Sequence, residues 1–161
     1  FFFKQKTAYE IYQCDWSSDV CSSDLRGYVL ADHSARGLRP SDWGARALAL
    51  YEALDADALV VEVNQGGEMV ETILRDLDPA TPVTAVRATR GKWLRAEPVA
   101  ALYAQGRVRH VGTFPELEDE LCDFGPGGLS SGRSPDRLDA LVWALTHLML
   151  RGSARPKVRG L

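Results

Sequence analysis

Three carboxylates are the residues of this sequence best placed to carry out chemistry together. Glu62 interrupts an apolar run, 58–63, in which a carboxylate is costly to bury unless it is paired or binds a metal. Asp136 and Asp139 are three residues apart in a helical pattern, so they share one side of that helix. Simpler explanations stay open: an ion pair at the strand end for Glu62, and a favourable first-turn charge for Asp136.

Convergence of these three residues would create a site for divalent cations. Clustered carboxylates repel one another unless positive charge lies between them. Oxygen ligands favour Mg²⁺ or Mn²⁺. Two such ions, about 3.5–4 Å apart, can activate a water and stabilise the leaving oxygen in phosphodiester cleavage.

A basic segment, 87–110, is the second chemical feature. It contains six Lys or Arg residues against one acid, Glu97, with Trp93 and Tyr103 interleaved. Such a face suits contact with DNA phosphates. The alternative is a solvated surface balanced by the acidic segment 116–120. The predicted DNA contacts are Arg90, Lys92, Arg95, Arg107 and Arg109.

Other candidate sites are weaker. The three His residues are scattered without the spacing of a zinc site, and Cys122 has no local partner. The sequence has no phosphate-binding P-loop motif. The loop 64–67 could offer backbone N–H groups to a phosphate, although a tight strand-to-helix turn explains it equally well.

Strands and helices are expected to alternate and so to position these residues. Strands are predicted over 27–32, 58–63, 82–86 and 108–111, and helices over 42–54, 69–77, 93–105, 114–124 and 134–149. Ser41 and Ser134 are the expected N-caps. Asp139 is expected at the edge of the apolar stripe of its helix, outside the core. This alternation predicts an α/β class with a largely parallel sheet.

Length and composition agree with one globular domain. The chain has 161 residues, of which 45% are hydrophobic, and this excludes global disorder. Three cysteines are too few for a disulfide scaffold, and no apolar run is long enough to span a bilayer. The net charge of −3 gives no global basic field, so any contact with DNA must be local.

Residues 1–25 differ from the rest of the chain. They show no hydrophobic period and no signal-peptide pattern. Codons that fit 4–10 and 15–24 spell the two fixed parts of a short-read sequencing adapter, so the segment resembles translated adapter joined to a gene fragment. A natural polar arm is the alternative. We expect the segment to be an artefact and not a domain, with the first strand of the sheet missing, an exposed sheet edge and an unstable chain.

The sequence 27–148 resembles the C-terminal nuclease domain of the large terminase subunit of tailed bacteriophages and prophages. The resemblance rests on YVLADHS, ADALVVEVNQGGEMV, VTAVRATRGKWLRAEPVAALYAQGRVRHVG, FPELEDELCDF and SPDRLDALVWALT. It implies an RNase H-like (resolvase- or integrase-type) mixed sheet flanked by helices over 26–150, followed by a basic tail, 151–161. It also implies a two-metal, Mg²⁺- or Mn²⁺-dependent endonuclease that cuts concatemeric double-stranded DNA during genome packaging.

The resemblance also assigns roles and partners. Glu62 is implied as the acid of the inner strand and Asp139 as that of the last helix, with Asp136 as a helper. A further Asp is expected on a first strand upstream of Gly27, and Asp32 is a weak alternative ligand. The implied partners are an N-terminal ATPase domain, a small terminase subunit and a portal protein, in the host cytoplasm and without a membrane. The chain itself is expected to be weak or inactive. A Holliday-junction resolvase, or a non-catalytic DNA-binding or motor-docking module, remains the alternative.

Overall fold

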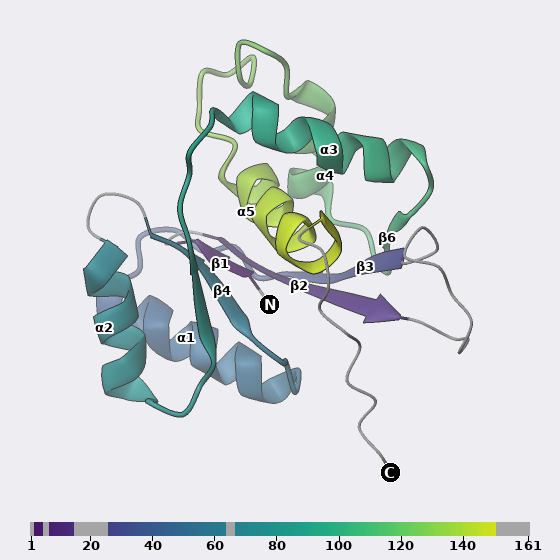
Figure 1. Ribbon diagram of the computed structural model, residues 1–161. Coiled ribbons are helices and arrows are strands. Elements are labelled where there is room, and N and C mark those ends of the chain that lie inside the picture. The colour runs from purple at the N-terminus through teal and green to yellow at the C-terminus, as the bar shows by residue number, and fades with distance from the viewer. Residues whose placement is uncertain (1, 5–6, 15–25, 64–66, 151–161) are drawn as a thin grey trace.

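A single mixed sheet forms the centre of the molecule (Figure 1). The computed structural model describes residues 2–4, 7–14, 26–63 and 67–150. The sheet has the strand order β5-β4-β1-β2-β3-β6. Its strands are β1 (Phe2–Lys4), β2 (Thr7–Cys14), β3 (Arg26–Asp32), β4 (Leu59–Glu62), β5 (Val83–Val86) and β6 (Val108–His110).

The directions of the strands correct the expectation of a largely parallel sheet. β1, β2 and β3 form an antiparallel meander, whereas β4 is parallel to β1 and β5, and β6 is parallel to β3. The alternation of strands and helices seen in the sequence begins only after β3, so it predicts only the part of the sheet in which strands pair in parallel. The mixed sheet is the one that the resemblance implies.

Strands β1 and β2 fall within residues 1–25, so the expectation of a missing first strand is wrong. β1 pairs with β4 through Phe2↔Val60 and Phe3↔Val61, and β2 pairs with β3 through six residue pairs. Strand pairing uses the N–H and C=O groups that nearly every residue carries, and pairing here covers edges that β4 and β3 would otherwise expose. Hydrophobic periodicity therefore misses such strands. The origin of the segment stays a prediction.

Helices cover both faces of the sheet. The helices α1 (Pro40–Ala53) and α2 (Gly67–Leu77) lie on one face, over a core that includes Trp43, Leu59, Val61 and Leu74. The other face carries α3 (Lys92–Ala104), α4 (Pro115–Asp123) and α5 (Asp136–Leu145), which continues as one π-helical segment over Thr146–Leu150. β4 is buried between the two cores, as its apolar run predicts.

Two helices begin at positions that differ from the predicted caps. α1 begins at Pro40 after the extended residue Arg39, because proline suits the first turn of a helix, so Ser41 is not its N-cap. α5 begins at Asp136, with Pro135 in the N-cap position instead of Ser134. The Ser134 hydroxyl instead donates to Asp136 Oδ1 at 2.7 Å. No helix among the described residues is long and apolar enough to cross a membrane.

Candidate active site

Glu62 and Asp139 meet where β4 ends beneath α5. The Glu62 side chain is 5% exposed and that of Asp139 is 1% exposed. Arg95 Nη2 on α3 lies 2.5 Å from Asp139 Oδ1 and 4.0 Å from Glu62 Oε1. Two carboxylates that are 77 residues apart in the sequence therefore reach the same guanidinium nitrogen. This burial corrects the expectation that Asp139 lies outside the core, because cations from α3 supply the charge that makes its burial tolerable.

Arg95 is the cation at the centre of this cluster. Its Nη1 donates to the backbone oxygen of Arg90 at 2.6 Å, and its guanidinium carbon lies 4.9 Å from the centroid of the Trp143 ring. Stacking on an aromatic ring and bonding of a planar fork are contacts that suit arginine and not lysine. Its Nε is buried and has no hydrogen-bond partner among the described residues. Arg95 is thus fixed on several sides, with one buried donor unsatisfied.

Lys92 and Asp136 form the rim of the cluster. Lys92 Nζ donates to Ser134 Oγ at 2.6 Å and lies 3.4 Å from Asp139 Oδ2 and 3.8 Å from Asp136 Oδ1. The side chains of Lys92 and Asp136 are 30% and 27% exposed, so solvent reaches them. Three carboxylates and two cations are therefore arranged from the buried Glu62 outward to the open Asp136.

The donor chemistry fits a hard divalent cation only in part. Glu62 and Asp139 offer buried carboxylate oxygens, the ligands that Mg²⁺ and Mn²⁺ prefer. In the described ranges, no group of three or more His, Cys, Asp or Glu side chains could hold a metal ion. Two of the three predicted ligands thus converge closely, and the third, Asp136, lies at the rim.

The strand beside Glu62 brings no further acid. β1 runs parallel to β4, so the carboxyl ends of the two strands lie at the same edge of the sheet. The sequence of β1 is Phe2-Phe3-Lys4, which contains no carboxylate. The acid expected on the first strand therefore has no counterpart there.

Asp32, the weak alternative ligand, is engaged elsewhere. Its Oδ2 lies 3.1 Å from Arg137 Nε, and its Oδ1 accepts hydrogen bonds from both the backbone N–H and the hydroxyl of Ser34. These contacts tie the end of β3 to the first turn of α5. They account for Asp32 as a residue that orders the loop after β3.

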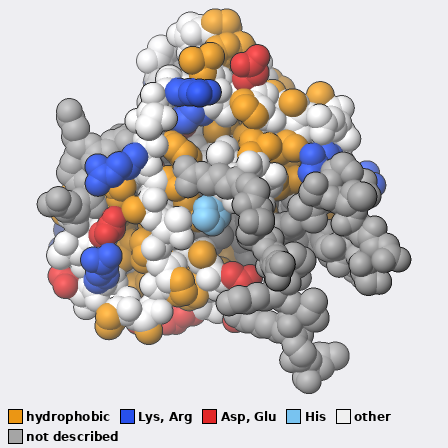
Figure 2. Space-filling model, viewed as in Figure 1, with side chains coloured by type: hydrophobic (Ala, Val, Ile, Leu, Met, Phe, Trp, Pro, Cys, Tyr) orange, Lys and Arg blue, Asp and Glu red, His pale blue; other side chains and the backbone are white. Residues whose placement is uncertain are grey.

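The predicted DNA contacts divide into two groups. Lys92 and Arg95, at the start of α3, turn toward the carboxylates, and the backbone of exposed Arg90 supports Arg95. Arg107 and Arg109 follow the other end of α3, about 20 Å along the helix. On the face drawn in Figure 2, the Lys and Arg side chains that are described lie apart from one another. DNA contact by these residues stays a prediction.

The role of Arg95 as the partner of both acids was not anticipated from the sequence. A usable signal was present. Arg95, Val99 and Leu102 follow one another at helical spacing, and Val99 and Leu102 are core residues. An arginine on the apolar stripe of a helix must find buried acceptors, and this demand points toward buried carboxylates.

Known proteins match this chain both in sequence family and in structure. A family model described as the terminase RNaseH-like domain matches residues 15–148, which include residues 15–25 of the segment interpreted as adapter. The structure is similar to that of the large terminase nuclease from thermophilic phage G20c, with a TM-score of 0.61 and 17% sequence identity. That alignment covers 90% of this chain and 78% of the phage chain. No curated protein matches the chain. The matches confirm the RNase H-like fold.

Proposed function

The chain belongs to the family of terminase RNase H-like domains, the nuclease part of the terminase large subunit, and on that premise we propose how its residues cut DNA. The reaction is hydrolysis of a phosphodiester in concatemeric double-stranded DNA during packaging. Glu62, Asp139 and Asp136 are the catalytic, metal-binding residues. The observation that carries this proposal is the convergence of buried Glu62 and Asp139 on a single nitrogen of Arg95.

Glu62 and Asp139 would hold the first Mg²⁺ or Mn²⁺, and Asp136 would contribute to a second ion at the open rim. When bound, such ions lower the pKa of a water and offset charge on the phosphate. Lys92 is exposed enough to meet a phosphate oxygen while its Nζ stays near Asp136 and Asp139. Because β1 supplies no acid beside Glu62, we expect weak cleavage by this chain.

The partners proposed for the parent protein follow from its family. Double-stranded DNA is the substrate. An N-terminal ATPase domain, a small terminase subunit and a portal protein are the other components of the packaging machinery, in the cytoplasm of the bacterial host. A junction resolvase or a non-catalytic docking module is not favoured. A docking module in particular gives no reason to bury two carboxylates together, since the removal of charges from water costs stability even where Arg95 lies beside them.

Mn²⁺ binding and plasmid nicking test the proposal. Glu62→Gln and Asp139→Asn should each weaken Mn²⁺ binding in calorimetry and reduce nicking by about 100-fold or more. Glu97→Gln, an exposed carboxylate on the same helix as Arg95, is the matched control and should change neither. Mn²⁺ binding and nicking that survive in both variants, with the fold retained in circular dichroism, would reject these ligands.

A further inference from the structure

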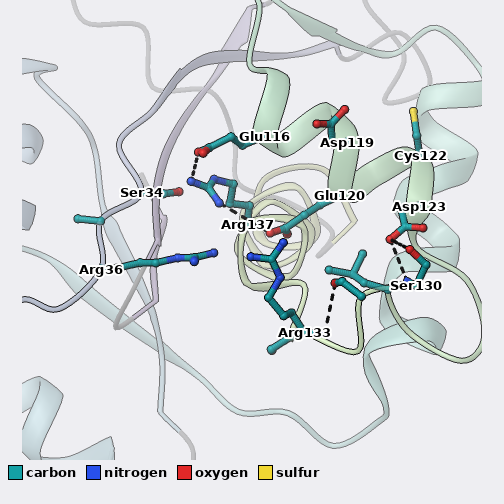
Figure 3. A pocket seen from close by; sticks show the side chains of 14 residues that line it. Ser34, Arg36, Glu116, Asp119, Glu120, Cys122, Asp123, Ser130, Arg133 and Arg137 are labelled. Carbon is teal, nitrogen blue, oxygen red and sulfur yellow. Dashed lines mark hydrogen bonds and ion pairs between the residues drawn. The ribbon is translucent and has the colours of Figure 1, made fainter.

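A second polar site lies on the other side of Ser134. It is a cavity of about 860 Å³ between the loop after β3, helix α4, the loop before α5 and the first turn of α5 (Figure 3). Most of the residues that line it are charged residues or serines. Small-molecule pockets are predominantly apolar, so this lining favours a charged ligand.

Three arginines direct their side chains into this cavity (Figure 3). Arg137 is engaged, because its guanidinium meets Asp32 at 3.1 Å and also pairs with Glu116 and Glu120. Arg36 and Arg133 are exposed, and the described part of the chain gives their guanidinium groups no ion pair or hydrogen bond. An anion offsets the charge of a guanidinium group that has no acid partner.

Most acids around the cavity already have partners. Glu120 accepts from the backbone N–H of Leu138 at 3.0 Å, and Asp123 accepts from the backbone N–H and hydroxyl of Ser130 at 2.9 and 3.0 Å. Glu116 is paired with Arg137. The exposed Asp119 points away from Arg36 and Arg133 in Figure 3. Arg36 and Arg133 are therefore the two cations of this cavity that make no ion pair with an acid of the described residues.

We propose that Arg36 and Arg133 bind a backbone phosphate of the DNA strand that enters the active site. Ser134 lines this cavity and also accepts the hydrogen bond from Lys92, so the cavity adjoins the carboxylate cluster. DNA carries a phosphate every 3.4 Å of axis on each strand, and arginine forks suit phosphate oxygens. A strand with one phosphate at Lys92 thus continues past Ser134 toward Arg36 and Arg133. This inference deepens the proposed function, because it rests on a DNA substrate.

The test is the salt dependence of duplex DNA binding by the full chain, measured by fluorescence anisotropy in EDTA. Arg36→Gln and Arg133→Gln should each reduce the slope of log K against log salt, and the double variant, which loses this one phosphate contact, should reduce it by about 0.9. Affinity should fall about tenfold for each. Arg46→Gln on α1, an exposed arginine on the opposite face of the sheet, removes the same charge and should leave the slope unchanged.

Several results would overturn the inference. The first is that the double variant has the same melting temperature as the original protein and the same slope of log K against log salt as Arg46→Gln. The second is that inorganic phosphate binds the original protein but not the double variant, while the two proteins bind DNA equally well. The site would then serve a free anion. Because EDTA removes metal and prevents cleavage, a failure of the metal ligands proposed above leaves this measurement unchanged.

Discussion

Replacement of Arg95 by methionine tests the geometry of the active site most directly. The substitution keeps much of the aliphatic volume but removes the cation that faces Glu62 and Asp139, whose side chains are 5% and 1% exposed. Loss of one partner of a buried ion pair costs about 3–5 kcal/mol of folding free energy, because the other charge stays buried. Lys92 remains 3.4 Å from Asp139, so we expect the lower end of this range.

Urea unfolding measures this cost, with Arg75→Met as the matched control. Arg75 pairs with Glu71 at 3.1 Å, but its side chain is 70% exposed, and such pairs contribute about 0.3–0.5 kcal/mol. We therefore expect Arg95→Met to lower the free energy of unfolding by several times more than Arg75→Met. In a thermal melt, the difference amounts to about 5–10 °C for a domain of this size.

Addition of Mn²⁺ separates the role of the charge from that of packing. A ligand that binds only the folded state stabilises it according to its concentration and affinity. With Arg95 replaced, a divalent cation supplies positive charge that Glu62 and Asp139 lack, so Mn²⁺ should stabilise Arg95→Met more than the original protein. The reasoning is refuted if Arg95→Met costs no more than Arg75→Met, or if Mn²⁺ stabilises both proteins equally.

Two further predictions concern the rest of the fold. Hydrogen bonds from the backbone N–H of Phe114 and from His110 lower the pKa of Glu118, so its contribution to stability is present above the ordinary value of 4.5 and is lost as the pH falls through and below it. The melting temperatures of the original protein and Glu118→Gln should therefore differ most above about pH 5 and converge toward about pH 3; a constant difference would contradict this. Gly44→Val should cost about 1–3 kcal/mol in urea unfolding, because a Cβ at Gly44 would lie 2.9 Å from Ile73 Cγ2. The exposed Ala49→Val in the same helix is its control, and an equal cost in both would show that the contact between α1 and α2 can adjust.

Several elements could be predicted from the sequence because their local pattern and their final environment agree. β4 is apolar except for Glu62, and the structure buries it between two helical layers. The helix 93–105 was predicted within one residue of α3 at each end, although Pro98 lies inside that helix. Glu62 could be singled out for the same reason, as a carboxylate that interrupts an apolar run.

Other features depend on contacts that local pattern does not encode. The N-cap serines were wrong because a proline next to each serine fixes where the helix begins. Strands β1 and β2 show no hydrophobic period and pair through their backbones with β4 and β3. The burial of Asp139 depends on the placement of α3 beside α5, which brings Arg95 and Lys92 to it across more than 40 residues of sequence.

The contact that stabilises the carboxylate pair is also the one with which a metal ion must compete. Arg95 holds Asp139 at 2.5 Å with the nitrogen that also faces Glu62, and an ion shared by these two acids has to draw their charge away from that nitrogen. The buried Arg95 Nε has no partner in the described structure, so this arrangement leaves one donor unsatisfied, which costs stability. When Arg95 is replaced, the affinity for metal should consequently rise and the stability of the metal-free protein should fall. This opposition is expected where an internal cation keeps the metal ligands of a folded site together.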